Sequence, residues 1–271
     1  MNTPTAAARF RALHQGPQPL LLPNAWDAGS ARVSEVAGAQ AIATTSAGLA
    51  WASGYADQYA LPMRFLLTTV SEIARVIHVP LSVDMEAGYA DELAAIADNA
   101  EALAKAGVVG INIEDGKLPP EILCERIAAT KRGAARAGVD LFVNARCDVY
   151  LKALTTPERA LEESISRGKK YKEAGADGFF LPGIVDPAGI RQVVSAVRLP
   201  LNVLVRAGLP RVSELAALGV RRISAGSGIS SAVYGLTRRA VRQFLDTGAY
   251  DLMLDGAMPY PEVNALFGQR S

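Results

Sequence analysis

The sequence predicts a (β/α)8 barrel of the TIM type, in the α/β class. Short segments that are apolar on both faces alternate with Ala-rich segments of helical periodicity, and this alternation occurs eight times within 271 residues. Strands that are apolar on both faces are typical of a buried parallel sheet, and eight strand–helix units at this length fit a closed barrel. A doubly wound open sheet fits less well, because no Gly-x-Gly-x-x-Gly follows the first strand and the alternation continues to the last unit.

The first three units follow a helical segment over 6–14. Asp27 is the expected N-cap of the first unit's helix. The second strand is expected to end at Ser46-Ala47-Gly48, with a loop over 50–62 behind it, and Gly107 closes the helix of the third unit. The expected strands are 19–24, 39–45 and 81–83, and the expected helices are 30–37, 64–78 and 91–106.

Prolines mark the helix starts of the next units, where a missing backbone N–H costs nothing. The expected strands are 108–113, 141–145, 178–181, 201–205 and 221–225. The expected helices are 119–137, 156–174, one from 186, 212–218 and a last one that ends at 247. We expect residues 1–271 to form one barrel domain with a short N-terminal helix and a C-terminal tail from Tyr250.

Composition narrows the class of protein. The net charge is +1 and no basic run stands out, which argues against a nucleic-acid or polybasic membrane surface. No apolar run approaches the ~20 residues that a membrane span needs, and the N-terminus lacks the apolar core of a secretory signal. We therefore expect a soluble cytoplasmic enzyme without a nucleic-acid or membrane partner.

Polar residues gather where the predicted strands end. In a parallel barrel these ends lie on one side, where the active site is found. The residues at these ends are Asn24, Ser46, Asp84, Glu86, Asn112, Glu114, Asn144, Arg146 and Asn202. Asp84 and Glu86 are two residues apart and should share a face, and paired carboxylates are ligands that Mg²⁺ prefers. Taken alone, the two acids could equally be solvated loop residues.

The histidines and cysteines do not suggest catalysis. His14 lies in the N-terminal helix and His78 precedes the third strand, near the opposite end of the barrel. Cys147 alternates with Arg146 and should face the core. Cys124 follows two prolines that favour a helix start, so it should be fixed on a helix. The two cysteines form no CxxC, and neither a disulfide framework nor a zinc site is indicated.

Taken together, five motifs resemble those of the isocitrate lyase/phosphoenolpyruvate mutase superfamily and occur in the same order. They are Pro23-Asn24-Ala25-Trp26-Asp27-Ala28, Thr45-Ser46-Ala47-Gly48, Val83-Asp84-Met85-Glu86-Ala87-Gly88-Tyr89, Gly110-Ile111-Asn112-Ile113-Glu114-Asp115-Gly116 and Asn144-Ala145-Arg146-Cys147-Asp148. The resemblance covers about residues 20–245. It implies an α/β barrel whose eighth helix is commonly exchanged between subunits of a dimer within a tetramer. It also implies Mg²⁺, with Mn²⁺ as the other metal, and small 2-oxo acids or hydroxy-tricarboxylates as substrates.

The resemblance implies roles for individual residues. Asp84 matches the main metal-anchoring Asp, Glu86 stands where a second Asp is usual, and Asp57 and Glu114 match acids that hold metal-bound water. Ser46, Ala47 and Gly48 match the segment that binds the substrate carboxylate. Arg146 matches the arginine that clamps the oxo acid, and Asn202 matches a polar residue of the seventh strand. The expected catalytic residues are Arg146 and Glu114. Asp84 is also an expected substrate-binding residue, because it holds the metal ion that binds the substrate.

The sequence departs from the family's lyases after the fourth strand. There it reads Glu114-Asp115-Gly116-Lys117-Leu118-Pro119-Pro120, without the Lys-Arg-Cys-Gly-His segment of the lyases or the Asn-bearing loop of the mutases. We expect a Mg²⁺-dependent carbon–carbon lyase or decarboxylase that works through an enolate. Two alternatives stay open: a barrel that binds 2-oxo acids without efficient turnover, and a P–C bond enzyme of the phosphonopyruvate type. A homo-oligomer, most simply a tetramer, is also expected.

Overall fold

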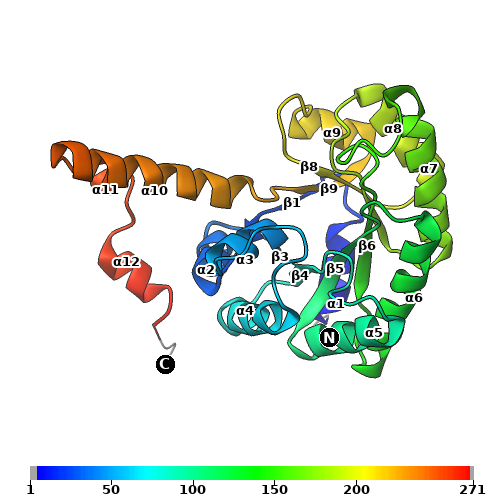
Figure 1. The fold of residues 1–271 in the computed structure, drawn as a ribbon, viewed down its shortest axis with the longest axis horizontal. Coiled ribbons are helices and arrows are strands. Elements are labelled where there is room, and N and C mark those ends of the chain that lie inside the picture. Colours follow the sequence, from blue (N-terminus) through cyan, green and yellow to red (C-terminus); the bar gives the residue numbers. More distant parts are fainter. Residues whose placement is uncertain (1–4, 269–271) are drawn as a thin grey trace.

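Parallel strands form the barrel that the sequence predicts. The computed structural model describes residues 5–268, and across them the strands follow the order β1-β9-β8-β7-β6-β5-β4-β3-β2, with every pairing parallel (Figure 1). Pro23 divides the first strand into β1 (Leu20–Leu22) and β2 (Asn24–Ala25). Since β1 pairs with β9 (Val220–Ser224) and β2 pairs with β3 (Ile42–Thr44), the two pieces close the barrel.

The remaining elements follow the predicted alternation. The other strands are β4 (Leu81–Asp84), β5 (Val108–Glu114), β6 (Phe142–Arg146), β7 (Gly178–Phe180) and β8 (Leu201–Leu204). The helices around them are α2 (Ala28–Val36), α4 (Met63–Val76), α5 (Leu93–Lys105), α6 (Pro120–Arg136), α7 (Pro157–Glu173), α8 (Pro187–Val197) and α9 (Val212–Leu218). Asp27 caps α2 by accepting a hydrogen bond from the backbone N–H of Ser30, as expected.

One segment differs from the prediction. The stretch after β3, expected to end the strand at Gly48 and continue as a loop, forms a short helix, α3 (Ser46–Ala52), with Thr45 as its N-cap. Gly48 lies inside this helix, and a Cβ there would come within 2.6 Å of Thr45 Cγ2 and 3.0 Å of Trp26 Cβ. The glycine is therefore required by close packing, which a local reading cannot distinguish from a strand end.

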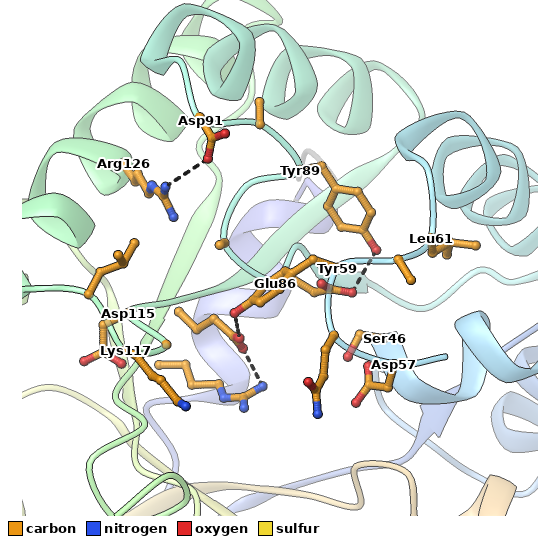
Figure 2. Close-up of a pocket in the computed structure, with 18 of the residues that line it drawn as sticks. Ser46, Asp57, Tyr59, Leu61, Glu86, Tyr89, Asp91, Asp115, Lys117 and Arg126 are labelled. Carbon is orange, nitrogen blue, oxygen red and sulfur yellow. Dashed lines mark hydrogen bonds and ion pairs between the residues drawn. The ribbon is translucent and has the colours of Figure 1, made fainter. Parts of the chain in front are cut away.

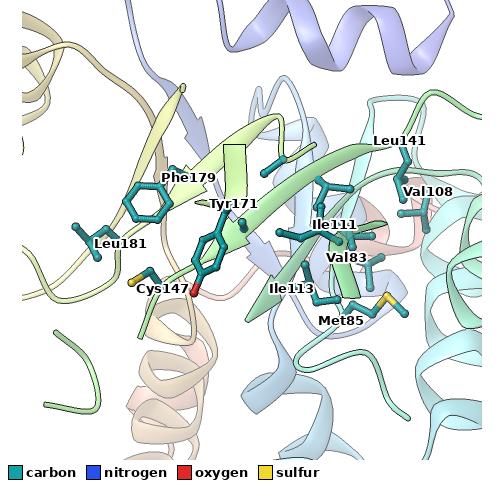
Figure 3. Packing of buried hydrophobic residues seen from close by; sticks show 14 of the residues in the cluster. Val83, Met85, Val108, Ile111, Ile113, Leu141, Cys147, Tyr171, Phe179 and Leu181 are labelled. Atoms are coloured by element: carbon teal, nitrogen blue, oxygen red, sulfur yellow. The ribbon is translucent and has the colours of Figure 1, made fainter. Parts of the chain in front are cut away.

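The main apolar core lies between the sheet and the helices around it. Figure 3 shows part of it, with Val83, Ile111 and Phe179 from three strands all fully buried beside Tyr171 of α7. Cys147 is fully buried in the same core, so its predicted packing role is confirmed. Burying apolar area of this kind is the main stabilising contribution to the fold.

A second apolar cluster closes the amino-terminal end of the barrel. Phe10 of α1 (Ala6–Leu13) is fully buried there and packs edge-on against Phe142 at 5.5 Å between ring centroids. His14 stacks on Phe142 at 4.2 Å, and Gly110 leaves the space that the Phe10 ring occupies. The N-terminal helix is therefore a plug for this end.

Ion pairs surround the plug. Arg11 binds Asp140 at 2.6 Å and Asp177 at 2.8 Å, and Lys131 also pairs with Asp177. Asp177 in turn accepts a hydrogen bond from the backbone N–H of Val143. The charged groups at this end thus meet opposite charges inside the protein.

The middle of the barrel is polar. Asn144 donates to Asn112 Oδ1 at 2.8 Å, and Arg222 donates to the same oxygen at 3.2 Å. Arg222 is fully buried, and burial lowers its pKa to about 9 despite the charge of Asp84. Ser224 donates to Asn202 at 3.2 Å, so these side chains form a hydrogen-bonded layer beneath the carboxyl ends of the strands.

The last helix leaves the barrel. Figure 1 shows α10 (Gly228–Thr247) extending away from it, with α11 (Asp251–Leu254) at its far end and α12 (Tyr260–Ala265) on the returning chain. Arg32 of α2 donates to the carbonyl of Leu266, which ties the tail back to the barrel. Over residues 5–268, no helix is long and apolar enough to span a membrane.

Candidate active site

A cavity of about 1140 Å³ opens at the carboxyl ends of the strands. The loop between α3 and α4 and the segments after β4, β5 and β6 form its walls. Figure 2 shows its acidic and basic side chains, which come from segments far apart in the sequence. The predicted residues Ser46, Asp57, Glu86, Glu114 and Arg146 all line it. The structure therefore brings together the strand-end residues that the sequence indicated.

Asp84 and Glu86 lie at the end of β4. Both side chains are buried, with Asp84 8 % and Glu86 4 % exposed. Asp84 accepts weak hydrogen bonds from the backbone N–H groups of Ser46 (3.5 Å) and Glu86 (3.4 Å). Glu86 follows the strand with a φ of +46°, a left-handed conformation that a non-glycine residue adopts at a cost. After this turn Glu86 lines the cavity, and the carboxylate of Asp84 lies close to that of Glu86.

Electrostatics in the cavity favour a cation. Burial raises the pKa of Glu86 to about 7, and the nearby charges of Asp84, Glu114 and Asp57 add to the shift. Glu86 Oε1 accepts a hydrogen bond from the Tyr89 hydroxyl at 3.2 Å, but buried Oε2 has no hydrogen-bond partner within residues 5–268. A buried carboxylate oxygen without a partner is costly, and a cation would relieve that cost.

Arg146 is held between two acids. Its guanidinium contacts Glu114 at 2.6 Å and Asp148 at 2.7 Å, and Lys152 contacts Asp148 at 2.9 Å. Burial raises the pKa of Glu114, an effect that the charge of Arg146 opposes. Tyr59 donates to the other Glu114 oxygen at 2.5 Å. The guanidinium is thereby fixed in orientation at the cavity wall, as a carboxylate clamp requires.

The donor set fits Mg²⁺ bound in part through water. No three Asp, Glu, His or Cys side chains of the described segment are arranged to ligate one ion directly. Mg²⁺ usually retains several waters and takes one or two carboxylates, so Asp84 with Glu86 can anchor the ion while Asp57 and Glu114 hold its waters. Mg²⁺ therefore fits the acids gathered at this end of the barrel.

Other predicted residues lie around this centre. In the first turn of α3, the Ser46 amide donates to Asp84 and the Gly48 amide donates to the N-cap Thr45, each at 3.5 Å. Ser46 lines the cavity, and Ala47 and Gly48 lie behind it in the same turn. Asn202 is fully buried in the barrel layer beside Ser224, and it does not line the cavity. Its match to a substrate-binding residue stays a prediction.

The histidines and Cys124 lie outside the cavity. His14 is at the plugged end, and the exposed ring of His78 lies beside Glu35. Cys124 is part of α6, as expected; burial and the charge of Glu121 raise the pKa of its thiol. The cavity lining among the described residues includes neither cysteine.

Sequence reasoning missed four cavity residues. Tyr59 and Tyr89 contact the acids but stand in loops whose paths the sequence does not fix. Lys152 stands four residues after Asp148, a spacing that could have suggested the pair. Arg126 lies on the apolar stripe of α6, together with Leu123 and Ile127, and this position could have marked it as inward-facing.

A parallel barrel with an acid-rich cavity at the carboxyl ends of its strands is an enzyme architecture. The model of the phosphoenolpyruvate phosphomutase family matches residues 10–245. The chain belongs to the isocitrate lyase/phosphoenolpyruvate mutase superfamily, a group of lyases and mutases. This confirms the resemblance read from the strand-end motifs.

Three relatives illustrate the match. A solved structure from Burkholderia cenocepacia J2315, provisionally named a phosphonomutase, is 41 % identical with a TM-score of 0.83, over 88 % of this chain and 99 % of that one. An uncharacterized protein of Mycobacterium tuberculosis is 35 % identical over 94 % of this chain and 95 % of its own length. The oxaloacetate decarboxylase of Paraburkholderia xenovorans is 31 % identical over 82 % of this chain and 76 % of its own.

Proposed function

We propose that this protein is a Mg²⁺-dependent carbon–carbon lyase that acts on a small 2-oxo acid or a related di- or tricarboxylate through an enolate. The observation that carries the proposal is the position of Glu86, Glu114 and Arg146 in one cavity, with the buried carboxylate of Asp84 close to Glu86. In such a site the acids can bind a metal ion that the substrate chelates, and Arg146 can bind the substrate carboxylate. The decarboxylase activity of a relative that covers most of this chain supports the same class of reaction.

The proposed mechanism assigns a task to each group. Bound Mg²⁺ would supply electrophilic stabilisation of the enolate oxygen. Asp84 and Glu86 would anchor the ion, and Asp57 and Glu114 would orient its water ligands. Arg146, held by Asp148, and the amides of Ser46, Ala47 and Gly48 would fix the substrate carboxylate. Tyr59 and the loop that carries it cover Glu114 and would limit access of water to the site.

A panel assay tests the proposal. Oxaloacetate, 2-methylisocitrate, isocitrate and phosphonopyruvate are each incubated with the protein and Mg²⁺ or Mn²⁺, and pyruvate or glyoxylate release is followed. We expect metal-dependent release from at least one C–C substrate, abolished by EDTA and restored by added metal. Turnover of phosphonopyruvate alone would instead indicate P–C chemistry.

The absence of a Cys or His from the cavity lining of the described segment favours a second candidate, a binding barrel without efficient turnover. Binding of 2-oxo acids without release of product from any panel member would support it. Absence of both binding and turnover would contradict both candidates.

We further propose that α10 is exchanged between subunits of a homo-oligomer, most simply a tetramer built from two exchanging dimers. Of its 20 residues, only Ser230 and Ala240 are buried, while Phe244 and Leu245 are 51 % and 75 % exposed. Large exposed apolar side chains on a helix that leaves the barrel are typical of an interface. Light scattering at micromolar concentration should give an oligomer; a monomer would contradict the proposal.

A further inference from the structure

Arg126 is a buried cation whose charge the protein leaves largely unpaired. It is 6 % exposed, and its Nη1 has no hydrogen-bond partner among residues 5–268. The acid that faces it is Asp91, whose carboxylate is 3.9 Å from Nη2 and fully exposed. That distance is longer than a hydrogen bond, and solvent screens the charge of the exposed Asp91. Burial of a guanidinium without a close acid is unfavourable.

The same cavity contains other cations, but their partners are close. Arg146 and Lys152 contact acids at 2.6 to 2.9 Å. Lys117 is exposed, so water satisfies its charge. Arg126 therefore differs from the other cations of the cavity lining: it is buried, and it lacks a carboxylate at hydrogen-bonding distance.

Arg126 lies apart from the proposed metal site. Figure 2 shows Arg126 and Asp57 on opposite sides of the cavity, with Glu86 between them. An anion that binds Arg126 on that side of the cavity would be a different group from one bound through the metal between Glu86 and Asp57. The cavity, at about 1140 Å³, has room for a substrate that reaches both positions.

We propose that Arg126 binds a second anionic group of the substrate and so selects dianionic 2-oxo acids over pyruvate-like monoanions. This inference rests on the proposed function, because it assumes that the first carboxylate is bound at the metal and Arg146. A guanidinium that lines the cavity can donate charge-assisted hydrogen bonds to a carboxylate or a phosphonate. The bound anion also removes the cost of the unpaired charge.

The test compares two ligands and two substitutions. Calorimetric titration with Mg²⁺ present gives the Kd of pyruvate and of 3,3-difluorooxaloacetate, which adds a second carboxylate. Arg126→Met should weaken difluorooxaloacetate about fiftyfold, the scale of a lost charge-assisted hydrogen bond, and should leave pyruvate within about threefold. Phosphonopyruvate in a parallel titration shows whether a phosphonate binds in place of the carboxylate.

The matched control is Arg132→Met, the same change at an exposed position of the same helix. It should leave both Kd values within about threefold. Thermal unfolding of the ligand-free Arg126→Met protein should occur at the same temperature as wild type or higher, because the substitution removes a buried unpaired charge. Unfolding at a lower temperature would indicate that Arg126 is structural.

Equal weakening of both ligands by Arg126→Met, or of neither, would overturn the inference and leave the proposed function intact. If wild type binds neither ligand in the presence of Mg²⁺, the proposed function fails and this inference fails with it. The two failures are therefore distinguishable.

Discussion

The two ends of the barrel differ in how completely their charged groups are paired. At the amino-terminal end, Arg11, Lys131, Asp140 and Asp177 form ion pairs around an apolar plug. At the carboxyl end, Arg146 and Lys152 also form ion pairs, but Glu86 has a buried oxygen without a partner and Asp84 has no ion pair within the described residues. The same strands supply both ends.

This contrast separates stability from function. Paired charges and buried rings stabilise the fold, whereas an unpaired buried charge reduces stability and, where it faces a cavity, marks a candidate ligand site. Changes at the carboxyl end should therefore affect activity more than stability, and changes at the plug should do the reverse.

The largest expected effect is at the site. Asp84→Asn should lower kcat/KM on the substrate identified by the panel by about a thousandfold, roughly 4 kcal/mol of barrier, because it removes the proposed metal anchor. Urea denaturation should show an unchanged or higher free energy of unfolding, since a buried negative charge is lost. A variant with full activity in metal-containing buffer would remove Asp84 from the proposed mechanism.

The plug should show the reverse behaviour. Phe10→Ala should lower the free energy of unfolding by about 4 kcal/mol, because it removes a fully buried ring and leaves a cavity. kcat/KM of the folded fraction should stay within about twofold. Leu21→Ala, at a 53 % exposed apolar residue, is the control and should cost less than about 0.5 kcal/mol. A comparable loss from both substitutions would mean that the plug adds no specific stability.

A third prediction concerns pH. Burial, with the charges of Arg222 and Arg11, lowers the pKa of His14 to about 3; the Nδ1–H bond to the Phe10 carbonyl and the charge of Asp177 oppose the shift. Between these two pKa values the unfolded chain binds a proton that the folded protein does not. The free energy of unfolding is therefore highest above pH 6.5 and decreases as the pH drops toward 3. Between pH 7 and 5 this loss is about 2 kcal/mol.

The measurement compares wild type with His14→Phe, which keeps a ring against Phe142 and cannot titrate. Urea unfolding at pH 7 and pH 5 should show a decrease about 2 kcal/mol smaller in the variant. The same pH dependence in both proteins would show that His14 is not protonated on unfolding in this range.

The smallest expected effect is at Cys124. Cys124→Ser should leave kcat/KM within about threefold, under ~1 kcal/mol, because the thiol lies on α6 outside the cavity lining and burial raises its pKa. A loss of about a hundredfold with the fold and metal binding intact would show that Cys124 reaches the reacting atoms. Cys124 would then belong to the active site and not to the packing of α6.

Much of the carboxyl end was predictable because parallel strands place their ends together. Asp84, Glu86, Glu114 and Arg146 each follow an apolar segment, and knowing the barrel was enough to group them. α3 was missed because Gly48 resembles a strand end, while its actual constraints are close contacts with Thr45 in the same turn and with Trp26, 22 residues earlier. The split of the first strand at Pro23 was likewise not predicted.

The sequence by itself determined the eight-unit barrel, its helix caps and the set of acids at the strand ends, because periodicity, capping and strand termination are local properties of the chain. Only the tertiary structure decided that Tyr59 contacts Glu114 and that Arg126 faces the cavity with a weak partner. It also decided that α10 lies off the barrel with an apolar surface. These features depend on loop paths and on contacts between distant segments, and no local pattern encodes the unpaired charge that results.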